Sequence, residues 1–160
     1  MKEIEVISKF TVYNKITELN AEEQKVMTKA ISMLDSAYAP YSKFYVGGAA
    51  MTESGNVYGG CNQENASYPL CICGERVALF NAGANEPTTP IKILAIVCHN
   101  PKVIIETPVS PCGACRQVIS EFELRHNSKI KILLKGDSDI IYKLNSGQDL
   151  LPMSFNSSYL

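Results

Sequence analysis

The stretch Ile91–Cys98 constrains the fold most strongly, because it is apolar almost throughout. Its longest purely apolar run, Ile93–Cys98, is far shorter than the roughly 20 residues that a membrane-spanning helix needs. A short apolar run of this kind is typical of a strand that is buried on both of its faces. The chain is therefore expected to fold around a sheet with other elements packed against it.

Helices and further strands are predicted on both sides of this strand. Asn20 and Glu23 have the spacing of a capping box, and apolar residues then recur at helical intervals until Ala39-Pro40. Apolar runs between turn residues predict strands at Val46–Met51, Val57–Cys61, Ile130–Leu134 and Ile140–Leu144, and helices from about Cys73 to Gly83 and from Pro111 onward. This order predicts an α/β fold with one mixed five-stranded sheet covered by helices.

The length of the chain, 160 residues, suits one domain, which we place at residues 20–160. Residues 1–19 form an extension, in which Ile4–Tyr13 has β-branched and aromatic residues in rough alternation and is expected to add a strand. The start of the chain lacks the basic segment and apolar run of a signal peptide. These features favour a cytoplasmic protein with no membrane partner.

The charge balance argues against a nucleic-acid partner. The chain has 15 basic and 16 acidic residues, which give a formal net charge of −1. A protein that binds a polyanion normally carries an excess of Lys and Arg. The six cysteines are also too few for a disulfide scaffold, in which roughly 8–10% of residues are Cys. In a reducing cytosol they are expected to be free, bound to metal or catalytic.

Two groups of cysteines carry the clearest chemical signal, and each lies at a predicted helix start. Cys112 and Cys115 are close to one helical turn apart, so both thiolates can reach one metal ion, for which zinc is the natural choice. Cys73 is the best candidate for a third ligand. If it lies at the helix cap, the Glu75 carboxylate can face the same pocket. Three cysteines leave a fourth zinc position for water, and a nearby carboxylate can then move protons.

Other interpretations of these cysteines remain open at this stage. Cys112 and Cys115 alone could form a redox pair or half of a structural zinc site. A fourth thiolate from Cys61, Cys71 or Cys98 would close the site, and Cys71 is the nearest to Cys73 in the sequence. The two histidines, His99 and His126, lie outside the cysteine groups, and we do not expect them to be ligands.

With these motifs in place, the sequence resembles the zinc-dependent cytidine deaminases that act on free nucleosides. The zinc-deaminase signature is a His or Cys, one residue and Glu, followed later by Pro-Cys-x-x-Cys. This chain has its all-cysteine version, and the resemblance extends over about residues 20–156. It is carried by Tyr38–Phe44, Gly60–Pro69, Cys73–Glu75, Ser110–Gln117 and Leu150–Phe155.

The resemblance implies a three-layer α/β/α fold and the hydrolytic deamination of cytidine and 2′-deoxycytidine to uridine and 2′-deoxyuridine, in pyrimidine salvage. One zinc ion per chain would be held by Cys73, Cys112 and Cys115, and Glu75 would carry protons between zinc-bound water and the pyrimidine. Arg76, rather than Arg116, would compensate the negative charge that three thiolates leave around the zinc ion. The residues implied to contact substrate are Phe44 at the base, Asn62 and Glu64 at the ribose, the Gly74 backbone N–H at the ring carbonyl, and Asn65, Tyr68 and Phe155.

The resemblance also implies a homotetramer with shared active sites. The apolar tail Leu150–Phe155 agrees with a buried position, either on the chain's own core or in a neighbour. Three residues depart from what the family usually has: Gly74 replaces Ala, Tyr45 replaces Pro and Gly48 replaces Ala. Gly74 keeps the backbone donor and is expected to loosen the helix start. Tyr45 is expected to change base selectivity and affinity rather than chemistry.

Three alternative functions remain from the sequence. An enzyme acting on another aminopyrimidine nucleoside, or on a nucleoside-like antibiotic, is disfavoured by Asn62 and Glu64 as ribose ligands. A deaminase that edits RNA or DNA would need a basic track that the net charge does not indicate. A structural zinc module would need a fourth protein ligand.

Overall fold

The computed structural model describes residues 1–160, with the side chain of Ser158 excepted. The strands are β1 (Thr11–Tyr13), β2 (Tyr45–Thr52), β3 (Val57–Cys61), β4 (Ile91–His99), β5 (Lys131–Lys135) and β6 (Ile141–Leu144). The α-helices are α1 (Ala21–Ser32), α2 (Gly74–Asn85) and α3 (Gly113–His126). Short 3₁₀ helices lie at Ile16–Glu18, Met33–Ser36, Tyr68–Leu70, Gly147–Asp149 and Ser157–Tyr159. All five predicted strands of the domain and its three predicted helices are therefore present, with boundaries within a few residues.

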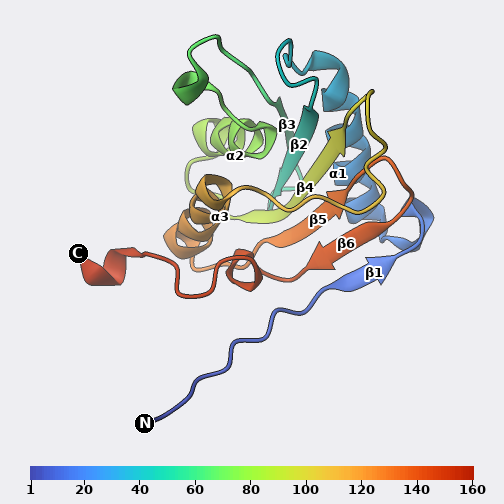
Figure 1. Ribbon diagram of the computed structural model, residues 1–160. Coiled ribbons are helices and arrows are strands. Elements are labelled where there is room, and N and C mark those ends of the chain that lie inside the picture. Colours follow the sequence, from blue (N-terminus) through green and yellow to red (C-terminus); the bar gives the residue numbers. More distant parts are fainter.

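The strands form one six-stranded mixed sheet in the order β1-β6-β5-β4-β2-β3 (Figure 1). Only β4 and β5 are parallel, and α3 lies in the connection between them. The predicted extra N-terminal strand exists at the edge of the sheet, but it covers only Thr11–Tyr13 instead of Ile4–Tyr13. The reason is its partner: Thr11 already pairs with Lys143, and β6 ends one residue later.

Helices cover both faces of the sheet, which gives the three layers expected. In β4, Ile93, Ala95 and Val97 belong to the core cluster on the α1 side. The alternate residues Leu94 and Ile96 belong to the cluster that also contains residues of α2 and α3. Because both sets are buried, β4 is the doubly covered strand that its apolar sequence predicts.

The capping box at the start of α1 is also confirmed. The Asn20 side chain accepts a hydrogen bond from the Glu23 backbone N–H at 3.0 Å, and the Glu23 carboxylate accepts one from the Asn20 N–H at 3.2 Å. These bonds satisfy two donors that a helix start otherwise leaves free. The helix packs against β2 and β4 through Val26, Met27 and Ala30.

Among the described residues, none of the helices has both the length and the apolar character that crossing a bilayer requires.

Candidate active site

The site lies at one end of the sheet, where three strand ends meet two helix starts. The antiparallel register places the start of β2 beside the end of β4, with Tyr45 opposite His99, and Gly47 lies opposite Cys61 at the end of β3. Cys73 is the N-cap of α2, and Cys112 is the N-cap of α3, both in extended backbone conformation. Cys73 therefore occupies the cap position that its convergence with Glu75 requires.

Close packing of α2 on the sheet explains two of the glycines. A Cβ atom on Gly74 would lie 2.6 Å from the Val46 carbonyl oxygen, and one on Gly48 would lie 2.8 Å from the Gly74 carbonyl oxygen. Alanine at either position would push the start of α2 away from β2. That Gly74 loosens the helix start stays a prediction, and the structure adds that Gly74 allows close contact between the helix start and the strand.

The three predicted metal ligands form one cluster. The Sγ atoms of Cys73, Cys112 and Cys115 all lie within 4.8 Å of one another. The Cys73–Cys112 distance is 3.9 Å, and the Cys112–Cys115 distance is 3.2 Å. Tetrahedral zinc with Zn–S bonds of about 2.3 Å places its sulfurs about 3.8 Å apart. The donor set and its spacing thus fit a zinc ion.

Each of the other three cysteines lies in a different environment, outside this cluster. The Cys61 thiol donates to the Ser36 carbonyl, and the Cys71 sulfur accepts from the Asn65 N–H at 3.2 Å. Burial raises the pKa of Cys98 to about 12, so this thiol stays protonated. Within the described chain the cluster therefore offers three thiols. That number is typical of a catalytic zinc site with an open position rather than of a closed structural site.

Electrostatics around the cluster favour negative charge at Cys73. Hydrogen bonding with Cys115, together with the Arg76 guanidinium, lowers the pKa of Cys73 to about 5. The same contact with Cys73, together with burial, raises the pKa of Cys115. Arg76 donates to the Cys73 sulfur at 3.7 Å. Arg116 instead donates to the carbonyls of Pro111 and Leu150, so Arg76 is the arginine placed against the thiolates.

Glu75 is buried beside the cluster, with only 4% of its surface exposed. One of its carboxylate oxygens, Oε2, has no hydrogen-bond partner in the protein. Burial raises the pKa of Glu75. A buried polar atom is normally paired, so this oxygen is available to a group that enters the cavity. A raised pKa also makes the carboxylate a better proton acceptor than an ordinary glutamate.

A cavity of about 410 Å³ opens onto the cluster and Glu75. Its size falls in the range usual for small-molecule sites, and its surface is largely apolar. Besides Cys73, Cys112 and Glu75, its lining includes Phe44, Asn62, Glu64, Ile96, Val109 and Ser110.

The two predicted ribose ligands, Asn62 and Glu64, both line this cavity, and both also hold its wall together. The Asn62 amide accepts from the Val46 N–H and donates to the Phe44 carbonyl, each at 2.8 Å. Glu64 accepts hydrogen bonds from Ser42 and from the Tyr41 N–H. Although partial desolvation opposes it, this hydrogen bonding lowers the pKa of Glu64, which keeps the carboxylate ionised.

The remaining predicted substrate contacts lie outside the cavity lining of their own chain. Asn65 is exposed, and Tyr68 borders a neighbouring cavity of about 340 Å³. Phe155 is 60% exposed and stacks on Tyr159. Their roles stay predictions, since the expected contact by the tail is with another subunit.

Some cavity residues did not emerge from the sequence as site residues. Ile96 and Cys98 both line the cavity, and alternate residues of a strand lie on the same face. Ile96 could therefore have been found from its position two residues before Cys98 in β4. Val109 belongs to the long connection before Cys112, where neither periodicity nor a motif indicates what it faces.

Comparison with known proteins places this geometry in a family. Residues 20–128 match the family model described as the cytidine and deoxycytidylate deaminase zinc-binding region. The chain is 46% identical over 99 residues to a cytidine deaminase of Sporosarcina psychrophila, covering 62% of this chain and 68% of that protein. It is 43% identical over 100 residues to the cytidine deaminase of Halalkalibacterium halodurans, covering 62% and 71%.

A solved structure agrees. The crystal structure of a cytidine deaminase from Burkholderia pseudomallei matches with a TM-score of 0.69 and 40% sequence identity, over 82% of this chain and 97% of that one. The matched family region contains Cys73, Glu75, Cys112 and Cys115. With fold, cysteine cluster and family model in agreement, the chain belongs to the cytidine and deoxycytidylate deaminase family of zinc-binding proteins.

Proposed function

We propose that the protein is a cytoplasmic hydrolase that converts cytidine and 2′-deoxycytidine, with water, to uridine and 2′-deoxyuridine and ammonia. The observation that carries this proposal is the buried, unpartnered Oε2 atom of Glu75 beside a cluster of three thiols in a cavity of small-molecule size. A structural zinc module would give that carboxylate no task. Family membership and the names of the relatives support the same substrate class.

In this proposal Cys73, Cys112 and Cys115 hold one zinc ion per chain. When bound, zinc supplies a Lewis acid that lowers the pKa of a coordinated water molecule. Arg76 donates to the Cys73 sulfur and reduces the excess negative charge of the three thiolates.

Glu75 is the proton carrier of the proposed reaction. Its free carboxylate oxygen accepts one proton from the attacking water and delivers it to the ring nitrogen beside the reacting carbon. It then accepts the second proton of the same oxygen, now bound to that carbon, and delivers it to the amine, which leaves as ammonia. Its burial supports this exchange, because a raised pKa brings the carboxylate closer to the pKa of its partners. Glu75 is the second residue of α2, and it is held in position because the start of this helix packs on the sheet.

The rest of the cavity orients the nucleoside. Phe44 lines the cavity and offers an apolar surface for the base. Gly74 is the first residue of α2, so its N–H has no acceptor within the helix and can hold the ring carbonyl. The ionised Glu64 accepts hydrogen bonds from ribose hydroxyls, and Asn62 has an amide N–H left for the sugar after its bond to the Phe44 carbonyl.

The direct test is the loss of cytidine ultraviolet absorbance, with ammonia measured in parallel, on adding the purified protein before and after zinc chelation. We expect equal amounts of uridine and ammonia, and activity that is lost with the metal and restored by added zinc. A protein that binds zinc but leaves cytidine and 2′-deoxycytidine unchanged would refute the proposal.

Ribose recognition predicts that free cytosine is a poor substrate. Without the sugar, the polar groups of Asn62 and Glu64 lose their partners, at a cost of about 1–3 kcal/mol each. Cytidine monophosphate and cytosine-containing oligonucleotides should also react slowly, because the ionised Glu64 repels a nearby phosphate. A panel of these substrates, with ammonia release as the readout, tests the prediction.

Two variants provide the comparison for that panel. Glu64→Gln should reduce the preference for cytidine over cytosine, whereas Glu53→Gln, at an exposed position of the β2–β3 turn, should not. Comparable turnover of cytosine, cytidine and an oligonucleotide by the wild-type protein would contradict the ribose assignment.

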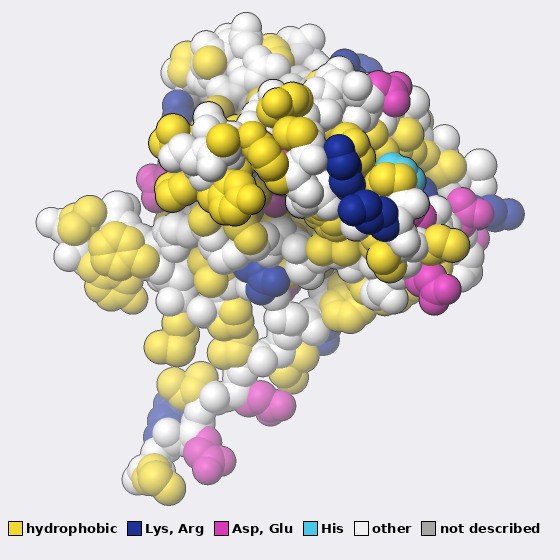
Figure 2. Space-filling model, turned by 45° about the horizontal axis from the view of Figure 1, so that its top comes forward, with side chains coloured by type: hydrophobic (Ala, Val, Ile, Leu, Met, Phe, Trp, Pro, Cys, Tyr) yellow, Lys and Arg dark blue, Asp and Glu magenta, His cyan; other side chains and the backbone are white. Residues whose placement is uncertain are grey.

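We further propose that the protein works as a homotetramer with active sites shared between subunits. Tyr68, Leu70 and Phe155 are large apolar side chains that are each at least 60% exposed in the single chain. Figure 2 shows hydrophobic side chains gathered on the face that carries the Tyr68–Leu70 segment, close to the cavity. A patch of this kind supports burial in an assembly.

Shared sites predict that Phe155→Ala raises KM by about two- to tenfold, since an aromatic contact contributes about 0.5–1.5 kcal/mol beyond area burial. Phe10→Ala serves as the matched control, because Phe10 is also exposed and its ring also packs against a tyrosine, Tyr142. The mass in solution is measured alongside activity. A fully active monomer of 17.6 kDa would contradict the assembly.

A further inference from the structure

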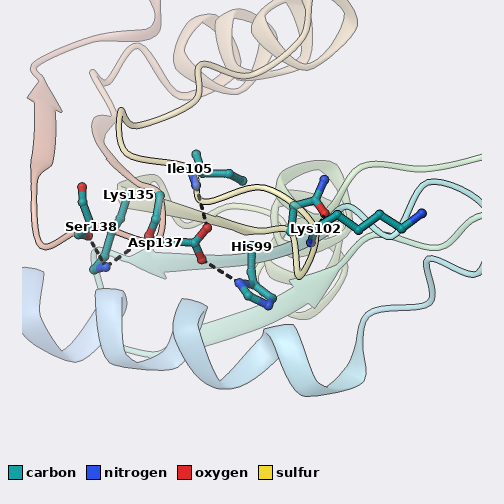
Figure 3. A network of polar contacts seen from close by, with 8 residues as sticks. His99, Lys102, Ile105, Lys135, Asp137 and Ser138 are labelled. Atoms are coloured by element: carbon teal, nitrogen blue, oxygen red, sulfur yellow. Dashed lines mark hydrogen bonds and ion pairs between the residues drawn. The ribbon is translucent and has the colours of Figure 1, made fainter.

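A polar network of side chains that have no role in the proposed reaction connects two loops (Figure 3). One is the long connection at residues 100–112, which runs from β4 to Cys112 and includes the cavity residues Val109, Ser110 and Pro111. The other is the turn between β5 and β6, which contains Asp137. The position of the first loop therefore sets one wall of the cavity and the approach to one cysteine of the cluster.

The Asp137 carboxylate holds this connection at two points. Its Oδ1 atom lies 2.6 Å from Nδ1 of His99, at the end of β4, and its Oδ2 atom accepts the Ile105 N–H at 2.8 Å. The backbone N–H of Asp137 donates to the Ile105 carbonyl, also at 2.8 Å. Asp137 thus fixes both the beginning and the middle of the loop.

The turn that carries Asp137 is itself well held. The Lys135 ammonium donates to the carbonyls of Gly136 and Ser138, and the Ser138 hydroxyl donates to the Glu106 carbonyl. A Cβ atom on Gly136 would lie 2.4 Å from the Ile105 carbonyl oxygen, so the two backbones are in direct contact. The turn is therefore a firm support for the loop.

The same network also contacts neighbours of cavity residues on β2 and β4. His99 directly follows Cys98, a cavity residue, and its ring stacks on Tyr45 with 6.4 Å between centroids. Tyr45 lies between Phe44 and Val46, which both line the cavity. Asp137 is thus connected to two segments that line the cavity, to residues 109–112 through Ile105 and to Phe44 and Val46 through His99 and Tyr45.

We propose that Asp137 is a positioning residue of the active site, which sets the conformation of residues 100–112 and through them the cavity wall and Cys112. The physical reason is that an irregular connection has many conformations of similar energy, and hydrogen bonds to an ionised carboxylate are strong enough to select one. The kinetic readout of this proposal rests on the proposed deaminase activity, whereas its structural readouts do not.

The test compares Asp137→Ala and Asp137→Asn with Asp139→Asn, an exposed aspartate in the same turn. Three quantities are measured on the zinc-loaded protein: amide hydrogen exchange, the rate of zinc release to a coloured chelator, and kcat and KM for cytidine. Asp137→Ala should speed exchange within residues 100–112 and zinc release by at least about tenfold, the range for losing hydrogen bonds to a charged group. Its KM should rise more than its kcat falls.

The other variants sharpen the result. Asp137→Asn keeps the shape of the side chain and should give a smaller change in the same direction. His99→Phe keeps a ring against Tyr45 and should remove only the contact between Asp137 and His99, leaving the hydrogen bond from the Ile105 N–H. Asp139→Asn should match the wild type.

Wild-type exchange and zinc release in both Asp137 variants would overturn the proposal. Faster exchange that extends equally to α1 would also overturn it, because Asp137 would then support only global stability. Hydrogen exchange and zinc release are measured without substrate, so both would still test the role of Asp137 if the protein were not a cytidine deaminase.

Discussion

Replacing Glu75 with Gln is expected to lower kcat for cytidine by at least about a hundredfold while the protein keeps its zinc. Glutamine has nearly the same shape, but it cannot accept and return a proton. The substitution leaves all three cysteines of the cluster in the protein, so the zinc ligands are kept. Because one carboxylate would serve both the attacking water and the leaving ammonia, the effect should reach the upper end of what a proton carrier contributes or exceed it. The measurement is kcat together with zinc per chain by elemental analysis.

A second buried glutamate provides the control. Glu123 is 5% exposed and accepts hydrogen bonds from the backbone N–H groups of Ile130 and Gly147, and it does not line the active-site cavity. Glu123→Gln should lower stability but leave turnover per folded molecule close to wild type. If Glu75→Gln kept wild-type turnover, the proton role would belong to another residue.

Replacing Cys112 with Ala should abolish zinc binding and activity together. The cluster has three thiols among the described residues, so the loss of one leaves two ligands, fewer than catalytic zinc sites use. Zinc per chain should fall from one towards zero, and added zinc should not restore turnover. Circular dichroism of the same sample checks that the fold survives.

Cys71→Ser is the matched control, because the Cys71 sulfur contacts the Asn65 backbone and lies outside the cluster. It should keep full zinc occupancy. Full occupancy in Cys112→Ala would instead show that the ligand assignment is wrong.

The elements of this protein follow from its sequence because their causes are local. The capping box of α1 needs only Asn20 and Glu23, three residues apart. The almost entirely apolar sequence of β4 requires other elements to pack against both of its faces. The cysteine motifs lie at helix starts, where unpaired N–H groups favour negative charge, so a cysteine cluster with Glu75 beside it was predictable.

Only the tertiary structure decided which other residues form the cavity and how they are held. Asn62 supports the backbone on both sides of Tyr45, and the strand at the N-terminus is short because its partner β6 ends. Asp137 fixes a loop that begins 37 residues before it in the chain. These contacts depend on strand register and on the packing of segments far apart in sequence. Local periodicity and capping carry no information about such pairings, because their energies arise only once the sheet has brought the partners together.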